Sequence, residues 1–187
     1  MRKVLYLLSE LDEEWLDWMV DAGTREWLNP GHVLVQEGRR ISVLYLTLAG
    51  RFEVRTSERV VAELGAGEII GELSFLDSRP PAATVTAVEK SSVLSIPTAR
   101  LNSKLKTDHV FGSKFYRALG VMLAHRLRDT TRSLAYGSLE RRMDSDVEEV
   151  GEFSPELLDS LNLAGARFQS LMQKLDAEKA RTVSSGT

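Results

Sequence analysis

Cysteine is absent from this chain, proline occurs only five times in 187 residues, and no long apolar run is present. Without cysteine there can be no disulfide, thiolate metal site or cysteine nucleophile, which suits a reducing compartment. The apolar run near the start, 4–8, is too short to span a bilayer and lacks a small-residue cleavage pattern. We therefore expect a cytoplasmic, uncleaved protein without a membrane partner.

Motifs for catalysis and metal binding are also missing. His32, His109 and His125 are too scattered for a metal site, and no serine lies in a G-x-S-x-G pattern. The formal net charge is only −3, and Arg126, Arg128 and Arg132 are expected on a solvated helix face. The sequence thus predicts a protein that is not an enzyme, with no catalytic residues and no metal.

What the chain does contain is a series of short β-prone runs. The runs are bounded by turn residues, and they cover 32–35, 44–48, 52–55, 60–64, 84–88 and 93–96. Ahead of them, Trp15, Leu16, Met19 and Val20 share one face of a short helix that ends near Gly23. Many short strands at regular spacing predict a mainly β fold with helices, built as an antiparallel jelly-roll β-barrel.

Two long helices are expected after the strands. The first, 110–134, has an amphipathic stripe, and the second, 154–181, starts at Ser154-Pro155-Glu156. A charged linker, 135–153, separates them, and 182–187 is expected to be a frayed tail. The second helix has an apolar heptad seam. This seam fits a dimeric coiled coil and packing on the helix's own domain equally well. The stripe consists of Tyr116, Leu119, Leu123, Leu127 and Leu134, and the seam of Leu157, Leu161, Ala164, Phe168, Leu171 and Leu175.

Residues 70–85, IGELSFLDSRPPAATV, carry the most information about function. They resemble the phosphate-binding cassette of cyclic-nucleotide-binding domains of the catabolite-activator and protein-kinase-A regulatory-subunit type. In that family a Gly-Glu pair is followed nine residues after the glutamate by an arginine, and here that position is Pro81. The glycines Gly31, Gly38, Gly50, Gly67 and Gly71 also match the turn glycines of the family. The resemblance runs from about residue 11 to 134 and places one domain at 1–134.

The resemblance assigns a role to each cassette residue. Glu72 would accept a ribose 2′-hydroxyl, although it could instead cap the short helix that it begins. Pro81 offers neither a cation nor an N–H to the cyclic phosphate, while Arg79, two residues earlier, could reach the same face of an extended segment. The backbone amides of the first turn and the small residues after Pro81 would form the rest of the cradle. These remaining candidate ligand-binding residues are Ile70, Gly71, Leu73, Ser74, Ala82 and Ala83.

Three functions remain open from the sequence. The first is a non-catalytic regulatory module whose cyclic-nucleotide binding is weak or lost, so that it acts through another ligand or a protein partner. The second is a sensor of cAMP or cGMP that relies on Glu72 and the cassette amides. The third, a transcription regulator, is disfavoured because 138–187 has six basic against ten acidic residues and no room for a winged domain, so no nucleic-acid partner is expected. A homodimer through the C-terminal helices is expected.

Overall fold

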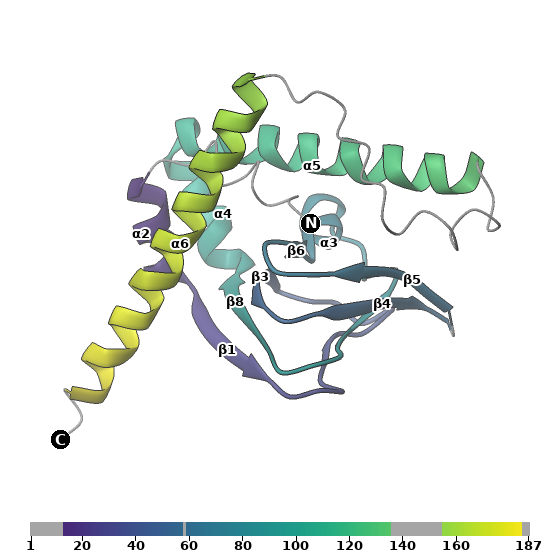
Figure 1. Cartoon of the computed structure of the whole chain (residues 1–187), viewed down its shortest axis with the longest axis horizontal. Coiled ribbons are helices and arrows are strands. Elements are labelled where there is room, and N and C mark those ends of the chain that lie inside the picture. The colour runs from purple at the N-terminus through teal and green to yellow at the C-terminus, as the bar shows by residue number, and fades with distance from the viewer. Residues whose placement is uncertain (1–12, 58, 136–154, 185–187) are drawn as a thin grey trace.

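Two antiparallel four-stranded sheets form the centre of the protein (Figure 1). The computed structural model describes residues 13–57, 59–135 and 155–184. One sheet has the order β1-β8-β3-β6 and the other β2-β7-β4-β5. The strands are β1 Thr24–Leu28, β2 Val33–Val35, β3 Val43–Ala49, β4 Phe52–Thr56, β5 Arg59–Leu64, β6 Ile69–Ile70, β7 Thr84–Ala87 and β8 Ser91–Pro97. This arrangement confirms the predicted antiparallel jelly roll.

The six strands expected from the β-prone runs are all present within a few residues of their predicted ends. Two strands were not predicted. β1 includes Arg25 and Glu26 and shows no alternating pattern, and it is a strand because it pairs with the buried β8 from Thr24↔Ser95 to Leu28↔Ser91. β6 has only two residues, which pair with β3 at Tyr45↔Ile70 and Leu46↔Ile69. Tertiary pairing, rather than local propensity, forms both.

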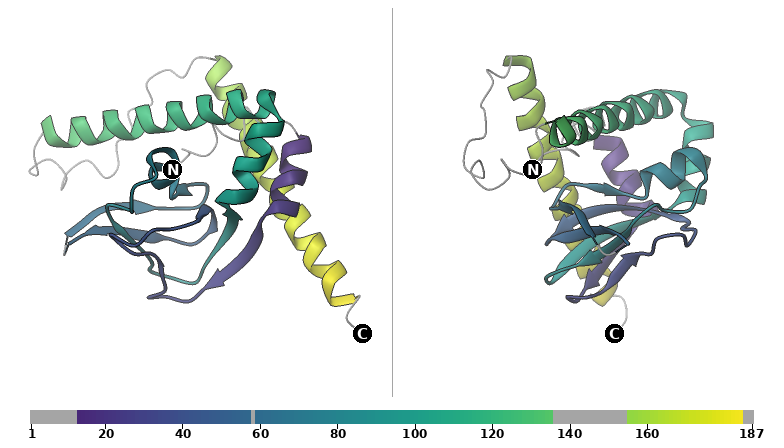
Figure 2. Two further views of the ribbon diagram at one scale, coloured as in Figure 1. Left: turned by 180° about the vertical axis from the view of Figure 1, so that it is seen from behind. Right: turned by 90° about the vertical axis from the view of Figure 1, so that its right-hand side faces the viewer.

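Helices gather at one end of the barrel and along one side of it (Figures 1 and 2). The predicted short helix is present as α2, and its four apolar residues are buried as expected. α4 was not predicted as a separate helix, and α6 continues to Ser184, beyond its expected end. The predicted linker 135–153 lies almost entirely outside the described residues, as do 185–187 of the tail. The bounds are α2 Glu13–Ala22, α3 Glu72–Asp77, α4 Thr98–Thr107, α5 His109–Ala135 and α6 Pro155–Ser184.

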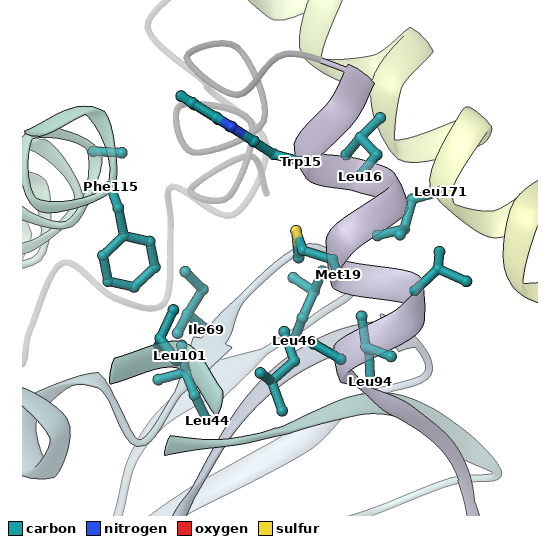
Figure 3. Packing of buried hydrophobic residues seen from close by; sticks show 14 of the residues in the cluster. Trp15, Leu16, Met19, Leu44, Leu46, Ile69, Leu94, Leu101, Phe115 and Leu171 are labelled. Carbon is teal, nitrogen blue, oxygen red and sulfur yellow. The ribbon is translucent and has the colours of Figure 1, made fainter. Parts of the chain in front are cut away.

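The larger hydrophobic core lies where these helices meet the first sheet (Figure 3). Trp15 of α2 packs edge-on against Phe111 of α5, with ring centroids 5.1 Å apart. Met19 and Leu94 belong to the same cluster, and both are almost completely buried. A second cluster fills the barrel between the two sheets around Phe52, Val85 and Val93. The position of α5 is therefore fixed at its N-terminal half by the larger core.

The amphipathic stripe expected on α5 does not form one buried face. Leu119 is buried, but Tyr116 is 49% exposed and Leu127 is 68% exposed. The face that enters the core is instead offset around the helix and consists of Phe111, Phe115, Ala118, Leu119 and Met122. Leucine spacing alone was misleading here because aromatic and small residues contribute equally to the buried side.

The heptad seam of α6 packs on its own domain. Ala164, Leu171 and Leu175 are buried in the larger core, and α6 runs beside α2 in both views (Figures 1 and 2). Ion pairs from Lys174 to Asp17 and from Arg25 to Asp176 flank this packing. The structure thus favours intramolecular packing for this part of the seam. Nothing is described of the side chains of Leu157 and Leu161, at the start of the same helix.

This packing predicts a large stability effect at Leu171. Its side chain is fully buried, so Leu171→Ala is expected to lower the free energy of unfolding by about 2–5 kcal/mol. Leu163 on the same helix is 45% exposed, and Leu163→Ala is expected to change it by well under ~1 kcal/mol. Urea unfolding of both variants checks this, and equal losses would show that α6 does not depend on its seam.

Candidate ligand pocket

A pocket of about 420 Å³ opens between the second sheet, the cassette and α5. Its volume falls in the range typical of small-molecule sites. Val35, Val54 and Val85 form an apolar wall from β2, β4 and β7, while Arg126 and Thr130 contribute from α5. The pocket also contains most of the cassette residues singled out from the sequence. These are Ile70, Gly71, Glu72, Leu73, Ser74, Pro81, Ala82 and Ala83.

The β6–α3 turn shapes the floor of this pocket. Gly71 has φ +96°, a left-handed conformation that favours glycine. A Cβ atom at Gly71 would lie 2.8 Å from Ile41 Cδ1 and 3.1 Å from the Val43 carbonyl oxygen. Glu72 follows directly as the first residue of α3, and the residue is only 3% exposed. The turn therefore aims a buried carboxylate into the pocket.

The segment after α3 forms the opposite side of the cradle. The Pro81 carbonyl accepts a 2.8 Å hydrogen bond from the Gly38 N–H, and the Ala82 carbonyl accepts one from the Thr56 hydroxyl at 3.4 Å. These bonds fix the backbone at the position where the cassette resemblance led us to expect an arginine. Pro81 presents only an aliphatic ring to the pocket at this point.

Arg79 does not replace the missing arginine in this structure. Its side chain is 84% exposed, and its Nε lies 3.8 Å from Asp77 Oδ2. It lines a separate 190 Å³ pocket on the other side of the cassette, together with Arg40. Eight of the nine candidate residues are among the described residues that line the ligand pocket, and Arg79 is not.

Arg126 supplies a cation that the sequence interpretation missed. Its guanidinium pairs with Glu72, lies 3.4 Å from Glu68 Oε2, and donates a 3.0 Å hydrogen bond to the Ile69 carbonyl oxygen. The expectation of a solvated Arg126 is therefore wrong, whereas Arg128 is exposed as expected. A usable signal was present, because Arg126 lies four residues after Met122 and seven after Leu119, on the buried face of α5.

The charges inside the pocket do not favour an anion. Glu68 and Glu72 are both buried, and Arg126 is the one cationic side chain among the described lining residues. Burial raises the pKa of Glu72 above its ordinary value, an effect that the nearby Arg126 only partly offsets. Glu63 also borders the pocket, but it pairs across the sheet with Glu53 on the outer face. Two buried carboxyl groups thus share one guanidinium, and that guanidinium is already engaged by them.

The described residues contain no metal cluster or membrane-spanning helix. Within 13–57, 59–135 and 155–184, no three His, Asp or Glu side chains come close enough to hold a metal ion. No helix in these ranges has the length and apolar character needed to cross a membrane. The described chain forms the barrel and its helices without an added catalytic domain.

The family model described as cyclic nucleotide-binding domain matches residues 25–108. The chain is 31% identical over 125 residues to the cAMP-dependent protein kinase regulatory subunit of Yarrowia lipolytica, covering 66% of this chain and 30% of that protein. It spans less than a third of the length of the curated relatives it matches.

Solved structures give the same fold. The N-terminal domain of a transcriptional regulator from Streptomyces coelicolor is 30% identical, with a TM-score of 0.56, and the match covers 70% of this chain and 94% of that one. A cyclic nucleotide-binding domain from Methylobacillus flagellatus has a TM-score of 0.66 at 22% identity, covering 72% of this chain and 83% of that one. Both matches show that this chain and those two structures share the same fold.

Proposed function

Because the chain belongs to the cyclic nucleotide-binding domain family, we propose that it is a regulatory module of that family in which ordinary recognition of the cyclic phosphate has been lost. It acts through another ligand or a protein partner. One observation supports the proposal: Pro81 lines the pocket at the cassette position where the resemblance expects an arginine, and Arg126, the one cationic side chain among the described lining residues, is paired with Glu72.

The electrostatics of the pocket support this choice over a cAMP or cGMP sensor. A cyclic phosphate would bring a negative charge next to Glu68 and Glu72 with no unengaged cation among the described lining residues. A ribose hydroxyl would also have to compete with a guanidinium for Glu72. Charge-assisted hydrogen bonds are about twice as strong as neutral ones, so the hydroxyl is the weaker partner.

Thermal unfolding in the presence of nucleotide tests the proposal. A ligand at 1,000 times its Kd stabilises a protein by about 4.1 kcal/mol, so 1 mM of a micromolar ligand would raise Tm by several degrees. We expect no shift in Tm with 1 mM cAMP or cGMP. A clear upward shift that Glu72→Ala abolishes would overturn the proposal and favour the sensor.

We further propose a homodimer through α5. Part of the α6 seam is used within the chain, whereas Tyr116, Gly120 and Leu127 are exposed on α5 with Leu123 half-buried between them. Their spacing of 4, 3 and 4 is that of a coiled-coil seam. A cytoplasmic location and a protein partner complete this proposal, and the acidic C-terminal region supports neither contact with nucleic acid nor a role as transcription regulator.

The dimer is tested by placing a charge in the α5 seam. Leu127→Glu is expected to convert the dimer to a monomer, because two like charges would face each other across the two-fold axis. Leu163→Glu, at an exposed position of α6, serves as the matched control and should leave the dimer intact. Light scattering after gel filtration measures the mass, and a wild-type monomer at 100 µM or an unchanged dimer in Leu127→Glu would contradict the proposal.

A further inference from the structure

Arg126 is the last strong attachment of α5 to the barrel in the described residues. Among the side chains of this helix that the structure describes, Met122 is the last buried one, and Leu127, Arg128, Thr130 and Thr131 are exposed. Both views show this half of α5 passing over the cassette side of the sheets (Figures 1 and 2). The contacts of one guanidinium therefore hold this part of α5 over the pocket.

The group that receives Arg126 is built for a guanidinium. Within five residues, Glu68 and Glu72 provide carboxylates and Ile69 provides a carbonyl oxygen, and all three face the same planar group. The two carboxylate side chains are 8% and 4% exposed. A cation is a suitable partner for these buried acids, because it offsets the cost of burying their charged forms. Arg126 fills this subsite from within the chain.

The remainder of the lining is mainly apolar. Val35, Val54 and Val85 contribute apolar side chains from β2, β4 and β7, Ser74 and Thr130 add hydroxyls, and the volume of about 420 Å³ is space left beside the Arg126 side chain. A ligand that brings only neutral hydroxyls would leave the acidic pair without its cation if it displaced Arg126. A ligand with a cationic head and an apolar body satisfies both parts of the pocket.

We propose that the pocket binds a small organic cation, with a guanidinium or amine head on an apolar body, which replaces Arg126 at Glu68 and Glu72 and releases the C-terminal half of α5 from the barrel. This inference rests on the proposed function, in which a ligand other than a cyclic nucleotide occupies the pocket. It identifies the class of that ligand. It also gives binding a mechanical output, because the released half of α5 includes Leu127 of the proposed dimer seam.

Butylguanidine, which has one guanidinium on a four-carbon apolar chain, is a suitable probe. Calorimetric titration should show at least tenfold tighter binding to Arg126→Ala than to the wild type, because the internal competitor is gone. Binding should be lost in Glu72→Gln. Arg128→Ala, an exposed arginine two residues further along α5, is the matched control and should bind as the wild type does. Equal binding to all four proteins, or none to Arg126→Ala, overturns the inference.

Hydrogen exchange gives a second readout that needs no variant to fold. Saturating butylguanidine should speed amide exchange of residues 123–135 in the wild type by tenfold or more, while residues 111–122 stay protected by the core. Unchanged exchange in 123–135 at saturation contradicts release of the helix. Failure of butylguanidine to bind leaves the proposed loss of cyclic-nucleotide recognition in place, whereas tight cAMP binding to the wild type would contradict that proposal itself.

Discussion

Replacing Pro81 with arginine is expected to raise the affinity for cAMP and cGMP by roughly 30-fold to several thousandfold. A buried, charge-assisted contact to an anion contributes on the order of 2–5 kcal/mol, which gives this range. The backbone is ready to carry the new side chain, because the Pro81 carbonyl is fixed by the Gly38 N–H and the residue already lines the pocket. Added positive charge would also offset the acidic pair at Glu68 and Glu72.

Pro80→Arg is the matched control for this gain. Pro80 precedes Pro81 directly, is exposed, and is not among the described residues that line the pocket. It makes the same change in charge without placing it at the phosphate position, so its affinity should stay near that of the wild type. Calorimetry on the two variants measures the difference. Equal affinities would mean that position 81 does not set phosphate recognition in this chain.

Removing Arg126 should cause a large loss of stability. Arg126→Ala leaves Glu68 and Glu72 buried without their cation, and breaking a buried ion pair in this way costs about 3–5 kcal/mol. The Arg126 side chain is 25% exposed, so we expect about 3 kcal/mol, the lower end of this range. Urea unfolding of the variant measures the loss.

Two further variants decide the origin of this loss. Arg128→Ala removes an exposed arginine from the same helix and is expected to change the free energy of unfolding by less than ~0.5 kcal/mol. Adding Glu72→Gln to Arg126→Ala removes one of the two unpaired carboxylates and should recover part of the stability. If the double variant is no more stable than Arg126→Ala, the penalty does not come from the buried acid.

The sequence was most informative where local chemistry and family pattern agree. Short β-prone runs between turn residues predicted six strands, and eight of the nine candidate cassette residues line one pocket. β1 and β6 could not be predicted because their strand conformation depends on partners far along the chain. Likewise, the sequence of the α6 seam fitted both a dimer and packing on its own domain. The burial of Leu171 in the core that includes α2 favours packing within the chain.

The interior of the pocket was harder to predict for a physical reason. The partner of Glu72 is 54 residues away in the sequence, on a helix whose buried face was assigned from its leucines. Arg79 looked suitable because alternate residues share a face in an extended segment, but it points away from the pocket towards Asp77. An ion pair between residues far apart in the sequence leaves only a weak local pattern. Here that pattern is one arginine on an otherwise apolar helix face.

The central claim is that this pocket has lost ordinary recognition of the cyclic phosphate, and calorimetric titration of the purified protein with cAMP and cGMP tests it most directly. The account predicts no heat of binding up to millimolar nucleotide for the wild type. Binding at micromolar or tighter that Glu72→Ala abolishes would contradict it, because the pocket would then bind a cyclic nucleotide despite Pro81 and the pairing of Arg126 with Glu72.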